Sequence, residues 1–566
     1  MTSTITEISD HYVEQLATLD PVTATFEGVP GHDDRLTDYS PDGINERLEH
    51  ARSVLRALAG ATIGSEPDRV AAEVLRAQVQ VGVEISEADE HLRPLRIIDS
   101  PVSDVRICFD LMSRDTEADW EAIVARTAAV PAALDGLIAS LREGTRRGVV
   151  AAQRQAAACA RQADTWGGHG TGHGEHTKPF FLGLVDEMAA SKADATKLRS
   201  RLEEVATRAT EAYAALGRFL VDEYLPGASE KDAVGAERYK LWARAWMGTD
   251  LDLQETYEWG WDELHRIEHA MGSVAERILP SEPMTAVVEH LEHDPTRMIT
   301  GEANLRAWLQ DLMDSTMQDL NGTHFDIPKP VQRVEAMIAP PGGAAAMYYT
   351  GPSEDFTRPG RTWYPTQGRT EFPLWGEVST CYHEGVPGHH LQIAMTRYLT
   401  DRLNRFQRTL ASNSGHAEGW ALYAERLMGE LGYLDDPAFE LGMLRAQAMR
   451  AVRVVVDLGL HLELAIPARD HFYPGETWTP ELALEFAMVR SQYDRGFMES
   501  EIDRYLGWPA QAISYKVGER FWLAGRAEVK KRLGAKFDLK QFHTQALELG
   551  PLGLDQLRDE LRRIGT

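Results

Sequence analysis

The sequence predicts a mainly α-helical protein that contains one small β-sheet. Apolar residues recur at steps of three and four positions over most of the 566 residues, which is the spacing of the buried face of an α-helix. Hydrophobic residues make up 43% and charged residues 26% of the chain, as in a globular protein with a large core. No long linker rich in Pro, Gly or Ser interrupts the pattern, so we expect one large domain over residues 1–566, built as one lobe or as two.

The clearest helical pattern lies between Leu253 and Ile278, where large apolar side chains form a single stripe. The same spacing predicts helices, in chain order, over residues 44–60, 68–90, 117–164, 182–225, 303–320, 376–399, 417–432, 438–465, 480–505 and 510–533. These segments cover most of the chain and indicate the mainly α class.

Two segments depart from the helical pattern. In residues 334–366, Pro and Gly separate short aromatic and β-prone stretches, which predicts a few short strands in a small β-sheet. Residues 165–177, TWGGHGTGHGEHT, are rich in Gly and His and cannot sustain a helix. We expect a mobile loop there, at the border of a cleft.

The charge and the cysteine content exclude several classes of function. A net charge of -28 would repel the phosphates of nucleic acid and an anionic membrane surface, so we expect neither as a partner. The first residues, MTSTITEISDHYVEQL, lack the regions of a signal peptide, and no run of about 18 apolar residues occurs. Three cysteines without C-x-x-C spacing indicate buried thiols. We therefore expect a cytoplasmic protein.

The hexapeptide EGVPGH occurs twice, at residues 27–32 and 384–389. Turn-forming residues surround the first copy and no second histidine lies near it, so we interpret this copy as a structural turn. The second copy follows His383 and precedes His390. It therefore forms part of H-E-x-x-P-G-H-H-x-Q, which contains potential metal ligands and a potential base.

The histidine spacing in the second copy differs from that of ordinary zinc hydrolases. Their H-E-x-x-H motif places two histidines one helical turn apart on one metal ion. On a regular helix, at about 100° per residue, His389 would point away from His383. His390 would face the same way as His383 but lie about 10 Å further along the axis. A regular helix therefore cannot bind a metal ion at this motif.

Pro387 and Gly388 predict a break in the helix between the histidines. Proline cannot donate to the carbonyl of His383, and its ring would clash there, at a cost of about 3 kcal/mol. Gly388 can adopt the positive φ that a bulge requires. Looping out two residues returns His389 to an effective i+4 position, so we predict His383 and His389 as ligands. His390 is the alternative second ligand, or a donor that supports the site or faces the substrate.

A catalytic zinc ion needs a third protein ligand and an open position. Glu418 lies in the next predicted helix among small residues that allow close packing, and we predict it as this ligand. Glu384 would be the general base that deprotonates the metal-bound water. Glu425 would orient a ligand histidine, and His416 is the alternative third ligand. A structural cluster of histidines is the alternative to a catalytic metal site.

Four motifs resemble those of a bacterial family, domain-of-unknown-function family 885. They are HEGVPGHHLQ (383–392), EGWALYAE (418–425), DLGLH (457–461) and QAISYKVG (511–518). The early TFEGVPGHDDRL is similar to the N-terminal turn of that family, and the resemblance spans nearly the whole chain.

The metal motif of that family is similar to that of the helical gluzincin peptidases, such as angiotensin-converting enzyme, thimet oligopeptidase and carboxypeptidase Taq. This resemblance implies a clam-like helical fold with a deep cleft, with the metal-binding core at about residues 370–520. It also implies zinc as cofactor, His383, His389 and Glu418 as its ligands, and Glu384 as general base. The two additional residues before His389 depart from the ordinary motif.

Tyr515 and His461 are candidates for the catalytic group that stabilises the oxyanion during amide hydrolysis. Core packing is the alternative for Tyr515. Arg450 and Arg453 are candidate clamps for a peptide carboxylate on the predicted helix 438–465. The structural alternative pairs Arg453 with Asp457 on a solvated face of that helix.

The predicted strands before the metal motif contribute further candidates for substrate binding. Tyr349 and Arg361, with Tyr348, flank a strand region whose edge could pair with an extended peptide. Core packing of both tyrosines is the alternative. Two other histidine groups are not predicted as catalytic sites. HRIEH (265–269) matches an inverted zinc motif but lies on a solvated face, and His169, His173 and His176 lie in the Gly-rich loop.

The residues together predict a zinc-dependent hydrolase of peptide or amide bonds in short substrates. A metal-dependent enzyme that acts on a non-peptide amide or a specialised metabolite is a related alternative, because the motif defines the water-activating centre better than the pocket. A metal-stabilised binding protein without turnover is the alternative from another class. The presence of Glu384 beside His383 argues against that alternative.

Overall fold

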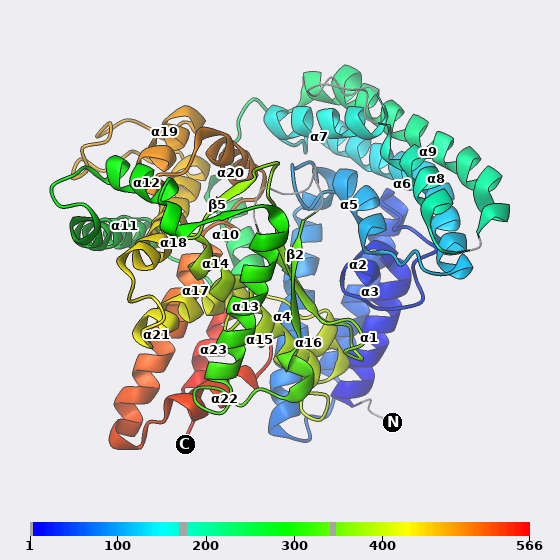
Figure 1. Cartoon of the computed structure of the whole chain (residues 1–566). Coiled ribbons are helices and arrows are strands. Elements are labelled where there is room, and N and C mark those ends of the chain that lie inside the picture. The colour runs from blue at the N-terminus through cyan, green and yellow to red at the C-terminus, as the bar shows by residue number, and fades with distance from the viewer. Residues whose placement is uncertain (1–3, 169–177, 194, 340–346, 566) are drawn as a thin grey trace. The chain divides into compact units, whose positions relative to one another are not determined.

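The computed structural model describes residues 4–168, 178–193, 195–339 and 347–565 (Figure 1). The chain forms two compact units. Unit 1 comprises Met1–Val234 with Leu506–Trp508, and unit 2 comprises Gly235–Tyr505 with Pro509–Thr566. Helices dominate both units, and the strands of the described chain lie in unit 2, so the predicted mainly α class with a small sheet is confirmed.

Unit 1 is built around the long helices α6 and α9. Large aromatic side chains, among them Trp120, Phe181 and Tyr213, are fully buried between α6, α7, α8 and α9. The helices of this unit are α1 (Ile5–Leu19), α2 (Pro21–Phe26), α3 (Pro41–Ala59), α4 (Glu66–Glu87), α5 (Pro101–Ile107), α6 (Glu117–Arg147), α7 (Gln153–Trp166), α8 (Phe180–Ala190) and α9 (Arg199–Phe219).

The predicted helix 117–164 is in fact two helices. Helix α6 ends before Gly148, whose φ of 71° is left-handed, and α7 begins at Gln153. Similarly, α8 and α9 divide the predicted helix 182–225. By length and composition α6 could span a membrane, but 56% of its apolar window is buried inside the protein, as in a core helix.

The first copy of EGVPGH forms a turn after α2, as predicted. Gly28 and Gly31 have φ values of 72° and 91°, which favour glycine. Arg126 of α6, which is fully buried, donates 3.0 Å hydrogen bonds to the carbonyls of His32 and Arg35. The first copy is therefore held by a buried side chain that donates to its backbone carbonyls, which supports a structural role.

Unit 2 contains the helices that carry the predicted metal motif. Its central helix, α18, is buried almost all round from Leu444 to His461 and packs along α11. The helices are α10 (Gly235–Met247), α11 (Leu253–Ile278), α12 (Met284–Glu292), α13 (Glu302–Leu320), α14 (Glu377–Glu384), α15 (His389–Tyr398), α16 (Arg405–Thr409), α17 (Ser414–Glu430), α18 (Pro437–His461), α19 (Pro480–Ser491), α20 (Arg495–Gly507), α21 (Ser514–Leu533), α22 (Leu539–Leu547) and α23 (Leu554–Leu561).

The predicted small sheet is present and lies beside α13 (Figure 1). Its strand order is β2 (Val334–Ile338), β4 (Gly360–Tyr364), β3 (Tyr348–Thr350). Strand β2 runs parallel to β4, and β3 runs antiparallel to it. The side chain of Gln310 in α13 bonds the backbone of β2 at Val334 and Ala336. A second pair, β1 (Met298–Thr300) and β5 (Glu371–Pro373), was not predicted.

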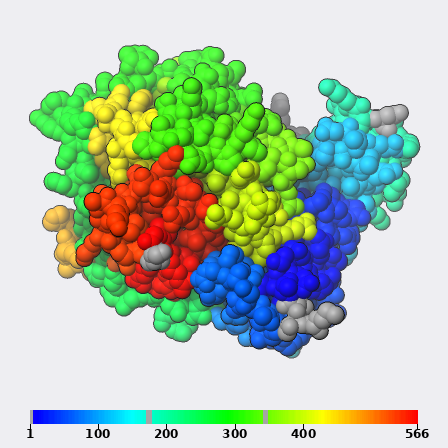
Figure 2. All heavy atoms as spheres, turned by 90° about the horizontal axis from the view of Figure 1, so that it is seen from below, coloured from blue at the N-terminus to red at the C-terminus, as the bar shows by residue number. Residues whose placement is uncertain are grey.

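The last helices cover one face of unit 2. Figure 2 shows the red C-terminal residues beside the yellow-green segment that follows α15. There Arg402 forms a 2.7 Å ion pair with Glu548, and a Cβ on Gly550 would contact Leu403 at 2.9 Å. The segment that contains α22 thus packs against the segment that contains α15 and α16.

Helices α17 and α21 approach each other closely through glycines. A Cβ on Gly518 would lie 1.9 Å from the carbonyl oxygen of Gly415 and 2.8 Å from the Cα of Gly419. Neither helix has room for a side chain at this crossing. The small residues around Glu418 therefore act as predicted, and they let α21 reach the region of the metal motif.

Gly518→Ala is expected to destabilise the protein by about 3 kcal/mol and to weaken metal binding, because backbone atoms must move to admit the methyl group. The exposed Gly272 of α11 is a matched control, since nothing lies within 4 Å of its Cβ position. Gly272→Ala should stabilise the helix by roughly 0.5–1 kcal/mol. Thermal unfolding with metal titration checks both, and an unchanged Gly518→Ala would contradict the close packing.

Candidate metal centre

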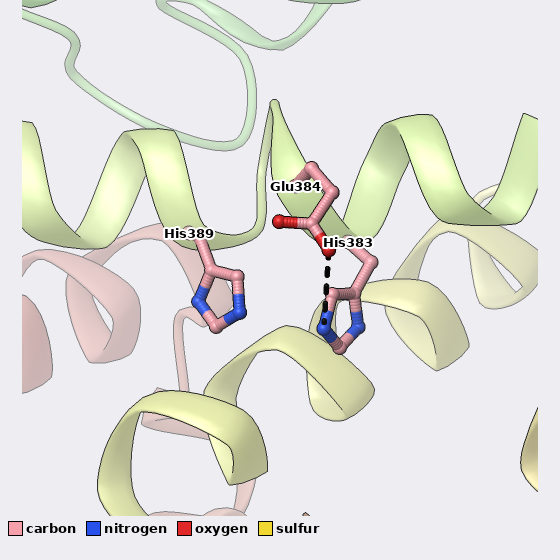
Figure 3. Close-up of side chains that lie close together, drawn as sticks. All are labelled: His383, Glu384 and His389. Atoms are coloured by element: carbon pink, nitrogen blue, oxygen red, sulfur yellow. Dashed lines mark ion pairs between the residues drawn. The ribbon is translucent and has the colours of Figure 1, made fainter. Parts of the chain in front are cut away.

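The metal motif is divided between two helices. Helix α14 ends at Glu384 and α15 begins at His389, so the predicted break is present (Figure 3). The peptide bond between Val386 and Pro387 is cis. The predicted positive φ of Gly388 is wrong, since its φ is -75° and its ψ is -130°. Glycine is required for a steric reason instead, because a Cβ there would lie 2.0 Å from the carbonyl oxygen of His383.

The break brings the two predicted histidine ligands together. The rings of His383 and His389 are 4.8 Å apart and nearly perpendicular, and the Glu384 carboxylate points into the same space (Figure 3). Within the described residues, these three side chains form a group of potential metal ligands whose ligand atoms all lie within 4.8 Å of one another.

Glu418 of α17 completes the group. Its Oε2 lies 3.4 Å from Nε2 of His383 and 3.4 Å from Nε2 of His389. Glu384 Oε1 is further away, 4.0 Å from the same nitrogen of His383. Oε2 of Glu418 is buried and has no hydrogen-bond partner in the described part of the chain. A buried carboxylate oxygen and two imidazole nitrogens that face one point fit the donor set of a zinc ion.

Glu425, which follows Glu418 by two turns on α17, fixes the orientation of His383. Its Oε1 accepts a 2.7 Å hydrogen bond from Nδ1 of His383, and its Oε2 accepts one of 2.8 Å from Ser379. Because Nδ1 carries the proton, Nε2 presents its lone pair to the metal position. Burial alone would lower the pKa of His383, but hydrogen bonds to Glu418 and Glu425 raise it to about 9. At neutral pH the ring therefore also carries a proton on Nε2 when no metal is bound. A metal ion at Nε2 would displace that second proton and leave the Nδ1 proton in its hydrogen bond to Glu425.

Helix α17 also holds the break between α14 and α15. The indole nitrogen of Trp420 donates a 2.9 Å hydrogen bond to the carbonyl of Pro387. The backbone N–H of Gly388 donates to the carbonyl of Tyr382 at 3.0 Å. These bonds decide which of the two adjacent histidines faces Glu418.

His390 points away from the metal position. It is fully buried, with Nε2 2.7 Å from the carbonyl of Val331 and Nδ1 2.9 Å from the hydroxyl of Tyr349. Both ring nitrogens are therefore engaged inside the protein, which contradicts a role for His390 in metal or substrate binding. The sequence could not reveal this, because both partners lie in other segments. Tyr349 is half-buried, and its hydroxyl and ring contact His390.

His416, the alternative third ligand, is not in the group. Its Nδ1 lies 3.2 Å from the amide nitrogen of Gln392, and its ring packs on Trp522. Burial lowers its pKa to about 3. Arg361 on β4 forms a 3.0 Å ion pair with Glu335 of β2, and no contact links it to the metal group among the described residues.

Tyr515 lies beside the metal group, as its predicted role requires. Its ring is nearly parallel to that of His383, with centroids 6.5 Å apart. Burial, together with the charge of Glu418, raises the pKa of the phenol to about 12, so the hydroxyl remains a hydrogen-bond donor at neutral pH. The guanidinium of Arg453 lies 4.5 Å from the centre of the same ring.

The solvated face that was the structural alternative for helix α18 does not exist. Arg453 is 5% exposed and pairs with Glu501 at 2.8 Å, where the sequence suggested a pair with Asp457. Glu501 also pairs with Arg504 and accepts a hydrogen bond from Tyr505. Glu501 could not be found from the sequence, because it lies on another helix, α20, and in no recognised motif.

A second buried ionic group ties four helices of unit 2 together. Lys516 of α21 is fully buried and lies 2.7 Å from Glu263 of α11, and it also contacts Glu519 and Gln447. Arg426 of α17 joins the same group through Glu263 at 3.1 Å. The group fixes α21, and with it Tyr515, relative to α11, α17 and α18.

His461 lies outside the metal group. Its Nε2 donates to the carbonyl of Tyr505 at 3.0 Å, and its ring packs near Tyr239. Burial lowers its pKa to about 4. Its contacts are those of a packed core residue, and none of them leads to the metal group within the described chain.

Asp457, on the turn before His461, is a buried acid whose charge is poorly compensated. Its Oδ2 accepts hydrogen bonds from the hydroxyl of Tyr239 and the backbone N–H of Ala510. Burial nevertheless raises its pKa to about 7. The native state therefore binds one more proton than the unfolded chain between about pH 4 and pH 7, and its stability falls as the pH rises through that interval.

Asp457→Asn is expected to remove this pH dependence, because the amide is neutral throughout. A pKa raised from 3.8 to about 7 corresponds to roughly 4 kcal/mol. The stability of the variant relative to the wild type should increase by up to that amount between pH 4 and pH 8. Thermal unfolding of both proteins across this range checks the prediction. A difference that does not change with pH would contradict it.

The other histidine groups do not form metal sites in the described structure. His265 pairs with Asp470 at 2.9 Å, and Glu268 pairs with Arg490, so HRIEH belongs to a surface ionic cluster. His169, His173 and His176 lie outside the described residues. The three cysteines are free and buried, as predicted.

Comparisons with other proteins agree with this architecture. Residues 21–561 match the model of a family described as "Bacterial protein of unknown function (DUF885)". A solved structure, the "putative lipoprotein from Colwellia psychrerythraea", is 22% identical, has a TM-score of 0.84, and matches over 100% of this chain and 99% of its own. A "putative lipoprotein of unknown function from Shewanella oneidensis" is 16% identical, with a TM-score of 0.72 and coverage of 98% and 99%. No curated protein matches the chain. These similarities show a shared fold.

Proposed function

The chain belongs to the bacterial family of unknown function DUF885, and we propose that it is a zinc-dependent hydrolase of peptide or related amide bonds in short substrates. One observation carries the proposal. Nε2 of His383, Nε2 of His389 and Oε2 of Glu418 face a common point, with the carboxylate of Glu384 beside it.

The donor set favours a catalytic metal site over a structural one. Three protein ligands leave one position of a tetrahedral zinc ion open, whereas structural zinc sites are normally closed by four. A zinc ion held by these residues would lower the pKa of a bound water to about 7.

The side chains around the metal position have distinct roles in this proposal. Glu384 takes a proton from the attacking water and passes it to the leaving amine. The oxygen of that water forms the new bond to the acyl carbon as the carbon–nitrogen bond breaks. The Tyr515 hydroxyl donates a hydrogen bond to the carbonyl oxygen, where negative charge develops. Glu425 holds His383 in the required tautomer.

The relationship to helical gluzincins, with the clam-like fold and deep cleft that it implies, is part of the same proposal. It favours short peptides over folded proteins as substrates. A non-peptide amide is the alternative substrate, because the metal-binding residues define the reaction and not the side groups of the substrate.

The test is metal analysis of the gently purified protein followed by hydrolysis of a short-peptide library. We expect about one zinc ion per chain, peptide cleavage that a chelator abolishes, and recovery when zinc is added back. A protein that binds no metal after zinc addition would contradict the proposal. A protein that binds zinc but hydrolyses neither peptides nor a panel of N-acyl amides would be a metal-stabilised binding protein.

We retain two expectations about the environment of the protein. The net charge of -28 argues against nucleic acid and anionic membranes as partners. A cytoplasmic location is consistent with the three free thiols, whereas the two solved structures are described as lipoproteins. Fractionation of cells that express the native gene tests the location, and recovery in the membrane fraction would contradict it.

A further inference from the structure

Arg450 of α18 is a buried cation with unusually few hydrogen bonds. It is 8% exposed, and its closest ionic contact among the described residues is Glu425 Oε1, at 3.5 Å. Its Nη2 also lies 3.5 Å from Nδ1 of His383, but that nitrogen donates its proton to Glu425 and cannot accept another. Its Nε is buried without a hydrogen-bond partner in the described chain.

Other buried arginines nearby make more and shorter hydrogen bonds, although Nη1 of Arg453 also has no partner in the described chain. Arg453 donates to the hydroxyl of Tyr505 at 3.0 Å and to Glu501 at 2.8 Å. Arg504 donates to both oxygens of Glu501 and to Gln511 at 3.0 Å or less. A buried guanidinium normally has its donors paired, because an uncompensated buried charge costs several kcal/mol. Arg450 therefore has donors available for an anion that the chain itself does not supply.

Arg450 lies close to the candidate metal ligands. Its guanidinium contacts the Nδ1 side of the His383 ring, and the opposite nitrogen of that ring, Nε2, faces the metal position. The guanidinium also lies 5.9 Å from the centre of the Tyr515 ring. Arg453, at 4.5 Å from the same ring, is already paired with Glu501. Of these two arginines beside the proposed oxyanion donor, Arg450 is therefore the one without a carboxylate closer than 3.5 Å in the described chain.

We propose that Arg450 binds the free α-carboxylate of a short peptide, so that the site releases amino acids from the C-terminus. A planar guanidinium pairs with a carboxylate through two parallel hydrogen bonds, a geometry that no neutral amide reproduces. The imidazole ring of His383 separates the Arg450 guanidinium from the metal position. This spacing suits a peptide in which one residue lies between the scissile bond and the C-terminal carboxylate. Water adds its oxygen to the acyl carbon, the carbon–nitrogen bond breaks, and the amine leaves as a free amino acid.

The inference rests on the proposed function, and its test separates the two. Pools of N-acetylated tripeptides are prepared twice, with a free C-terminal carboxylate and as the C-terminal amide. For the zinc-loaded wild type we expect kcat/KM for the free acids to exceed that for the amides by roughly 10- to 100-fold, the usual contribution of hydrogen bonds to a charged group. In Arg450→Gln the ratio should fall close to one through loss of activity on the acids alone.

The matched control is Arg277→Gln, which removes the same charge from unit 2 at a half-exposed pair with Glu440. It should keep the wild-type ratio. Equal activity of the wild type on acids and amides would overturn the proposal. So would an Arg450→Gln variant that loses activity on both pools equally, which is the behaviour of a residue that only supports the fold.

A binding experiment tests the subsite without turnover. Calorimetric titration of the zinc-loaded Glu384→Gln variant with the two pools should show tighter binding of the free acids, and Glu384→Gln/Arg450→Gln should abolish the difference. If the wild type hydrolyses no peptide while the Glu384→Gln variant binds the free acids more tightly, the subsite is supported and the hydrolase is rejected. If the wild type hydrolyses peptides while the Glu384→Gln variant binds acids and amides equally, the hydrolase is supported and the subsite is rejected.

Discussion

Replacing Glu384 by Gln is expected to lower kcat for peptide hydrolysis by about 10²- to 10⁴-fold, while one zinc ion per chain remains bound. Gln has nearly the same shape but cannot accept the proton of the attacking water. The carboxylate of Glu384 is also the more distant of the two that face Nε2 of His383, at 4.0 Å compared with 3.4 Å for Glu418. Its loss should therefore affect turnover and leave the metal in place.

Glu377→Gln is a suitable control, since Glu377 lies in the first turn of the same helix and away from the metal group. It should retain activity and zinc. Loss of zinc from Glu384→Gln would show that Glu384 is a metal ligand, and the assignment of the base would then be wrong. Full activity of Glu384→Gln would exclude it from the chemistry altogether.

The second large effect is expected on zinc affinity. His383→Gln, His389→Gln and Glu418→Gln should each weaken zinc binding by more than about 100-fold, because each removes a proposed direct ligand. Glu425→Gln should weaken it by about 10- to 100-fold, the usual effect of a residue that orients a ligand. Competition with a chromophoric chelator measures all four variants.

His390→Gln is the control for this series. Glutamine can still donate to the carbonyl of Val331 and accept from Tyr349, so the fold and the zinc site should both persist. Strong zinc loss from His390→Gln, with normal binding by His389→Gln, would mean that the wrong histidine of the adjacent pair has been assigned. Circular dichroism of every variant separates metal loss from unfolding.

Much of the helical architecture could be predicted from local patterns. The apolar stripe between Leu253 and Ile278 corresponds to α11, and its stripe residues are buried. Helix ends were harder, since α6 stops at Gly148 although the periodicity continues beyond it. The periodicity shows which side of a helix is apolar, whereas a left-handed glycine decides where the helix ends.

The candidate ligands were also visible in the sequence, because the histidine spacing and Pro387 together exclude a regular helix. The sequence alone left two choices for the second ligand. Trp420 and the carbonyl of Tyr382 hold the chain between α14 and α15 so that His389 turns to Glu418 and His390 turns into the core. Those partners lie in different helices, and no spacing rule connects them.

The sequence by itself thus determined the mainly helical class, the break in the metal motif and the set of candidate ligand and base residues. These depend on short-range chemistry: apolar periodicity, the missing N–H of proline, and the affinity of imidazole and carboxylate for metal ions. Only the tertiary structure decided which histidine faces Glu418, that α18 has no solvated face, and that the nearest ionic partner of Arg450 among the described residues is 3.5 Å away. Such features depend on burial and on partners brought together by helix packing.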